Sequence, residues 1–208
     1  MKTILAFLFI FGAVPALATD FEQETLFSGD IEHGAFGGPS IKVLSVKDEP
    51  GVLVGGYGGW LINHSLMLGG GAFGLVNNIL ASNDVPLINS KRPSTAFGYG
   101  GPMIEYTGNP KELVHYTAHM LIGGGVAGYY LRDHHDWDEG PDLDFHNDNW
   151  DICLAMEFGA GVELNVASFF RINAGVSYLF VNGIELPGLA DGDINGPSAH
   201  LTLKFGKF

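Results

Sequence analysis

Hydrophobic and polar residues alternate along much of the second half of the chain. From Trp150 to Asn165 the even-numbered positions are apolar, whereas the odd-numbered positions are polar or small. The same alternation runs from Phe170 to Phe180 and from Val114 to Tyr130. A period of two places successive side chains on opposite faces of a β-strand. The pattern therefore predicts long strands, each with one apolar face and one polar or small face.

Turn-forming residues divide the chain into about eight such strands. They are expected near residues 34–46, 51–62, 65–77, 95–106, 112–130, 150–165, 169–182 and 196–208. Globular strands are usually about five or six residues long, whereas a strand that crosses a membrane needs about 9 to 11. Short connections alternate with the long ones at 78–94, 131–149 and 183–195, except that the first connection, at 47–50, is short. We therefore predict an all-β fold, an antiparallel up-and-down transmembrane β-barrel of about eight strands.

Glycine supports a narrow barrel. The chain has 31 glycines, about twice the usual share, and they lie inside apolar stretches. The segment from Leu68 to Gly74 resembles the segment from Ile122 to Gly128, as hairpin repetition would produce. Glycine inside a strand permits the tight bending that a small barrel requires.

The first residues predict an export signal. Lys2 precedes an apolar run over residues 4–14, and Ala16-Leu17-Ala18 provides a small-x-small cleavage site. The run is too short to span a bilayer as a helix. We expect residues 1–18 to be a signal peptide and residues 19–208 to form the barrel domain.

Charge and cysteine content exclude several classes of protein. The formal net charge is −13, whereas nucleic-acid binding requires clustered Lys and Arg. Cys153 is the single cysteine, so an internal disulfide is excluded.

Three motifs match binding sites only superficially. Gly69-x-Gly71-x-x-Gly74 resembles a dinucleotide fingerprint, but no helix is expected after it. The segment from Asp191 to Gly196 begins like a calcium loop, although position twelve is Thr202 instead of Glu. The acidic, histidine-containing segment 133–148 has no defined ligand spacing, so a solvated loop is favoured over a cation site.

His115 and His119 are four residues apart on one strand face, which puts their backbones about 13 Å apart, too far to share a metal ion. We predict no catalytic, cofactor or metal site.

Aromatic residues gather near the ends of the expected strands, as in the two girdles of a membrane barrel. The expected girdle residues are Trp60, Tyr106, Tyr116, Phe170 and Phe205 on the short-turn side, and Tyr130, Trp150 and Phe180 on the loop side.

The polar strand faces predict an ion-paired lumen. A three-residue turn at 166–168 would place Leu164 opposite Phe170 and Glu163 opposite Arg171. Glu157, His200 and Lys204 lie on the same kind of face and would extend the network. The lumen of an eight-stranded barrel is narrow and normally filled by side chains, so we expect no open channel.

With these features the sequence resembles the eight-stranded outer-membrane barrels of Gram-negative bacteria, and in particular a group of uncharacterised members. The resemblance rests on the segments 55–65 and 69–77, on Gly196-Pro197-Ser198, and on the ending from Lys204 to Phe208. It implies an outer-membrane location after export and assembly by the barrel-insertion machinery. Phe208 departs from the family pattern because it is out of step with the apolar series that ends at Phe205; a kink at Gly206 would restore its face.

These observations predict a non-enzymatic barrel with a structural or surface-interaction role. Its expected partners are outer-membrane lipid and an unknown extracellular partner at loops 131–149 and 183–195, with no nucleic acid. The alternative is a soluble exported barrel of lipocalin type that binds a small apolar ligand. An enzyme acting on lipid would need a catalytic group that the sequence does not identify.

Overall fold

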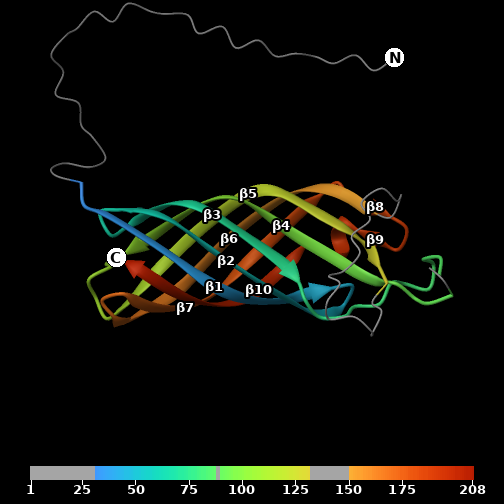
Figure 1. Cartoon of the computed structure of the whole chain (residues 1–208), viewed down its shortest axis with the longest axis horizontal. Helices are drawn as coiled ribbons and strands as arrows, with labels where there is room; N and C mark the ends of the chain where they lie inside the picture. The colour runs from blue at the N-terminus through green and yellow to red at the C-terminus, as the bar shows by residue number, and fades with distance from the viewer. Residues whose placement is uncertain (1–30, 88–89, 132–149) are drawn as a thin grey trace, which may run out of the picture. The chain divides into compact units, whose positions relative to one another are not determined.

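A computed structural model describes residues 31–87, 90–131 and 150–208. Over these ranges eight long strands close into one antiparallel barrel in the order β1-β10-β7-β6-β5-β4-β3-β2 (Figure 1). The strands are β1 (His33–Val46), β2 (Glu49–Ile62), β3 (Leu66–Leu75), β4 (Ser94–Gly108), β5 (Val114–Tyr130), β6 (Trp150–Ala167), β7 (Phe170–Asn182) and β10 (Gly196–Lys207). The predicted fold and its eight strands are confirmed, with small differences at strand ends.

The first hairpin is closed by a two-residue turn. β1 pairs with β2 from Val46 opposite Glu49 to His33 opposite Ile62. The turn residues Lys47 and Asp48 have φ values of 55° and 63°. Positive φ at both central positions is the type I′ geometry, which matches the right-handed twist of a hairpin. The short first connection is therefore compatible with an up-and-down barrel.

Three short turns lie at one end of the barrel, and the long connections lie at the other end together with the two-residue β1–β2 turn. β1 begins and β10 ends at the end that holds the turns after β2, β4 and β6 (Figure 1). At the other end, the connection from β7 to β10 contains β8 (Glu185–Leu186), β9 (Leu189–Ala190) and the short 3₁₀ turn η1 (Asp191–Asp193). The expected signal peptide and nearly all of the 131–149 loop fall outside the described residues.

The two faces of the wall have opposite chemistry. Large apolar side chains on the outside are exposed, among them Ile152, Phe158, Val162 and Val176. The inward face of the wall carries six buried charged side chains, namely Lys42, Glu105, Glu157, Glu163, Arg171 and Lys204. No helix within the described residues is both long and apolar enough to cross a bilayer.

The pairing of β6 with β7 corrects one prediction. Glu163 lies opposite Asn173 and Leu164 opposite Ile172, so the expected pairs with Arg171 and Phe170 were wrong. The register shifts between Asn165 and Ala167. A bulge leaves one residue unpaired in the ladder, so the strand continues past Asn165 and the chain turns later than the sequence indicated.

The last strand also differs from expectation. β10 keeps its inward and outward alternation through Gly206, which lies opposite Phe36. Phe208 consequently packs against the buried Phe36, with ring centres 5.6 Å apart. The kink that would turn Phe208 to the outer face is not formed, and its ring instead closes the short-turn end of the interior.

Candidate functional site

Glu163 is the centre of an ion-pair cluster in the turn-side half of the lumen. Its Oε1 lies 3.1 Å from Nη1 of Arg171 on β7 and 3.0 Å from Nε2 of His115 on β5. Its Oε2 accepts a short hydrogen bond from Nζ of Lys204 on β10. Three strands thus supply partners to one buried carboxylate, whose isolated charge would be expensive away from water.

Lys204 links this cluster to the opposite wall. Its ammonium also donates to Oε1 of Glu105 on β4, over 2.6 Å. The other carboxylate oxygen, Oε2 of Glu105, accepts from the hydroxyl of Tyr57 on β2 at 2.8 Å. One lysine therefore bridges two carboxylates across the barrel and ties β10 to β4 and β6.

A second cluster surrounds Glu157. Nζ of Lys42 on β1 lies 2.6 Å from both carboxylate oxygens, and the hydroxyl of Tyr99 on β4 donates to Oε2 at 2.6 Å. His119 on β5 approaches Oε1 at 3.4 Å. The Lys42 ammonium is also 3.4 Å from the ring centre of Phe73, which is a cation–π contact.

The two clusters meet at His119 and His200, whose ring centres are 5.3 Å apart. Nε2 of His200 lies 3.2 Å from Oδ1 of Asn173, and the amide nitrogen of Asn173 reaches Oγ1 of Thr117 at 2.8 Å and Oε2 of Glu163 at 3.5 Å. The lumen network is therefore continuous from Glu157 to Glu163.

The loop end of the interior is apolar. Side chains from the wall pack there with residues of the loops, and the buried set includes Val46, Phe97, Ala127, Leu179, Ile79, Val85, Ile184, Leu186, Leu189 and Ile194. The hydroxyl of Tyr129 donates to the carbonyl oxygen of Pro187 at 2.7 Å, which fixes the β8–β9 hairpin to the wall. We call this layer the apolar plug, since it lies between the ionic network and the loop face.

Asp191 and Asp193, the candidate calcium-loop residues, have local partners. The carboxylate of Asp191 accepts from the backbone N–H groups of Gly183 and Ile184 at 3.2 and 2.8 Å, and Asp193 accepts from that of Ala190 at 2.8 Å. These contacts hold the segment from Gly183 to Asp193 together. In the described part of the chain no group of three or more His, Cys, Asp or Glu side chains is arranged to hold a metal ion.

All five residues of the expected lumen network are buried, but they divide between the clusters. Glu163, Arg171 and Lys204 come together, Glu157 belongs with Lys42, and His200 lies between. Sequence reasoning missed Lys42 and Glu105 as network members. The available signal was a single charge between two apolar residues. Lys42 lies between Ile41 and Val43, and Glu105 lies between Ile104 and Tyr106. The side chains of these four neighbours are exposed on the outer wall.

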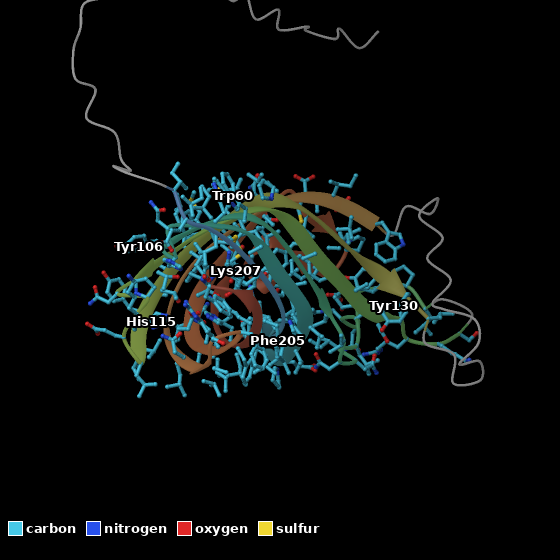
Figure 2. The ribbon with its side chains drawn as sticks, turned by 60° about the vertical axis from the view of Figure 1, so that its left-hand side comes forward. Trp60, Tyr106, His115, Tyr130, Phe205 and Lys207 are labelled. Carbon is cyan, nitrogen blue, oxygen red and sulfur yellow. The ribbon has the colours of Figure 1, made fainter. Side chains whose placement is uncertain are left out.

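The expected girdle residues lie towards the two ends of the barrel. Figure 2 shows Trp60 and Tyr106 towards one end and Tyr130 towards the other. Trp60, Tyr106, Tyr116, Phe205 and Phe180 are exposed, whereas Phe170, Tyr130 and Trp150 are partly covered. Phe170 stacks on Phe205 with ring centres 4.8 Å apart, so part of its surface is shielded by its neighbour.

These features define a closed, eight-stranded, antiparallel up-and-down barrel with an apolar outer wall and a charge-paired interior. Its fold is similar to that of Neisserial surface protein A, at a TM-score of 0.54 and 13% identity, covering 86% of this chain and 100% of that one. Ail, the attachment invasion locus protein of Yersinia pestis, aligns at a TM-score of 0.44 and 13% identity, covering 84% of this chain and 97% of that one. No protein-family model matches the sequence, and no curated protein matches it.

Proposed function

We propose that this protein is a non-enzymatic barrel of a Gram-negative outer membrane, with a structural or surface-interaction role carried by its loops. The observation that carries the proposal is that the wall has its apolar face outside and its charged face inside, the reverse of a water-soluble barrel. Exposed Phe158 and Val162 are outward neighbours of Glu157 and Glu163, each of which is only 1% exposed. A bilayer is the environment that solvates an apolar outer wall, and each of the eight described wall strands pairs with two neighbours in the closed ladder, as lipid requires.

The same inversion disfavours the soluble lipocalin-type alternative. Such a barrel would turn its apolar face inward around a ligand and its charges outward to water. Here Lys42 and Lys204 are 3% and 1% exposed, while Ile152 is 83% exposed. An exposed apolar surface on this scale marks a membrane or partner contact.

The closed interior favours a loop-based role over transport. The network fills the lumen from the Glu163 cluster on the turn side to the Glu157 cluster, and the apolar plug covers the loop side. Three buried cations, Lys42, Arg171 and Lys204, face three buried carboxylates, Glu105, Glu157 and Glu163. A passing solute would have to break these pairs, at several kcal/mol for each unpaired charge.

The loop face is the surface left for interaction. Among its described residues the acidic ones are Asp48, Glu49, Asp84, Asp151, Glu185, Asp191 and Asp193, against Lys47, Lys91 and Arg92. This excess of acid favours a basic partner through electrostatic steering. By its name the structural neighbour from Neisseria is a surface protein, which agrees with a role at the cell surface.

Cysteine labelling in intact cells tests the location and orientation together. In a Cys153→Ser background, a single cysteine is placed at Glu185 on the loop side or at Lys111 on the turn side. A membrane-impermeant maleimide should label Glu185→Cys in intact cells and Lys111→Cys only after lysis. Recovery of both variants in the periplasmic wash would favour the soluble barrel, and the reverse labelling pattern would invert the orientation.

Planar-bilayer recording tests the closed lumen. The purified protein should give no steady large conductance, whereas a continuous open channel would contradict the plugged interior and favour a transport role.

A further inference from the structure

Two histidines from opposite parts of the wall share one buried space. His119 is on β5 and His200 on β10, and their rings meet edge to face at an interplanar angle of 67°. An added Cβ at Gly159 on β6 would collide with the His119 ring, and one at Gly175 on β7 would come within 2.8 Å of Nε2 of His200. Glycine at both positions leaves the recesses in which the rings lie.

The hydrogen bonds of His200 suit its neutral form. The amide nitrogen of Asn173 faces Thr117 and Glu163, so its Oδ1 faces His200 and accepts from Nε2–H. Nδ1 of His200 is buried and has no hydrogen-bond partner among the described residues. A second proton on this ring would therefore be a buried donor without an acceptor, which is unfavourable.

The charges around the pair also oppose double protonation. In the strand ladders, His200 lies opposite Lys42 of β1 and Gly175 of β7. His119 lies opposite Glu105 of β4 and Gly159 of β6, approaches Glu157, and packs against the ring of Tyr57. Lys204, whose ammonium contacts Glu105 and Glu163, is a further buried cation of the same lumen. Glu157 and Glu105 can compensate one added proton, but both carboxylates already have lysine partners.

We propose that the His119–His200 pair is an acid-sensitive latch, which holds the lumen network together while His200 is neutral and weakens it when both rings are protonated. The unfolded chain can protonate both histidines at acidic pH, near the ordinary histidine value of about 6.5. At this pair the folded barrel then binds fewer protons than the unfolded chain, so the contribution of the pair to stability falls as the pH drops through this range. The latch makes the closed lumen depend on pH.

His115 is a third buried histidine of the lumen, and both of its ring nitrogens face partners. Its Nδ1 faces the carbonyl oxygen of Glu112 at 3.1 Å, and its Nε2 faces Glu163 at 3.0 Å. Both neighbours are acceptors, so the doubly protonated ring donates to both. His115 therefore lacks the unpartnered buried nitrogen on which the latch rests.

Urea unfolding of the refolded barrel in lipid vesicles tests the latch at about pH 7.5 and about pH 5. We expect the wild-type midpoint to fall on acidification and the fall to be at least halved in His200→Gln. Glutamine keeps a donor for Asn173 but cannot be protonated. His64→Gln changes a partly exposed histidine of the β2–β3 turn, outside the lumen, and should show the same fall as the wild type.

An equal fall in His200→Gln and the wild type, or no acid dependence in the wild type, would overturn the proposal. If His200→Gln does not fold, histidine-selective NMR titration of the unchanged protein decides the question. The latch requires that His119 and His200 do not both become protonated while the barrel remains folded; two complete, independent titrations in the folded barrel would exclude it.

Discussion

The guanidinium of Arg171 reaches Glu163 diagonally across the wall, with Nη1 and Oε1 3.1 Å apart. In the strand ladder Arg171 lies opposite Asn165, and Glu163 lies opposite Asn173. The pair therefore spans one step of the inward face, and the ring of Phe208 lies 4.0 Å from the Arg171 guanidinium. Arg171 and Glu163 are not paired in the ladder. They meet because both side chains point into the lumen.

Removing the carboxylate charge of Glu163 should destabilise the barrel. Glu163→Gln leaves Arg171 without a carboxylate partner and Lys204 with only Glu105. Breaking a buried pair costs about 3 to 5 kcal/mol, and urea unfolding in lipid vesicles measures the loss. Glu185→Gln on the exposed loop is the matched control and should be nearly neutral. An unchanged stability of Glu163→Gln would indicate a hydrated lumen that screens the charges.

The Lys42–Glu157 pair should show strong energetic coupling. Lys42→Met leaves Glu157 with only Tyr99 and His119, and Glu157→Gln leaves the Lys42 ammonium against Phe73 and Tyr99 without a counter-charge. The double variant removes both charges, so it should be more stable than the sum of the single losses predicts. We expect a coupling energy of about 1 to 3 kcal/mol in a double-mutant cycle. Additive losses would show that the two groups do not interact.

A charged side chain on the outer face near the middle of β6 should destabilise the barrel. Phe158 is exposed and packs edge to face on Phe180. Phe158→Arg should destabilise the barrel by about 2 to 4 kcal/mol if the position lies near the bilayer midplane, and Phe158→Leu is the control. Spin labels give a direct readout: a label at Phe158 should report lipid and one at Glu157 should not. The opposite result would favour the soluble barrel.

A single substitution in the β1–β2 turn should increase the stability of the barrel. Burial lowers the pKa of Lys47, although the nearby carboxylates of Asp193 and Glu49 act in the opposite direction. Its backbone has a φ of 55°, which Asn adopts more readily than Lys. Lys47→Asn should therefore stabilise the barrel by about 0.5 to 1 kcal/mol. The replacement Lys47→Val, which is β-branched, should have the reverse effect, and equal stability of the two variants would refute the backbone argument.

Local periodicity predicted most of the fold. Alternation depends only on the backbone of one strand, so the outward faces of β5, β6 and β7 could be derived without knowledge of their neighbours, and turn-forming residues indicated the other strands. The length of β5 and β6, together with the alternation of short and long connections, then favoured an up-and-down barrel. The charge of Glu157, Glu163, Arg171 and Lys204 on the second face was visible for the same reason.

Tertiary structure alone decided which charges meet. The partners Lys42 and Glu157 are 115 positions apart in the chain, and Lys204 and Glu105 are 99 apart. Such pairs depend on barrel closure and on the stagger between strands, because a shift in register changes which inward residues share a level. The bulge between Asn165 and Ala167 and the inward ring of Phe208 likewise follow from how neighbouring strands fit together, which the periodicity of a single strand does not contain.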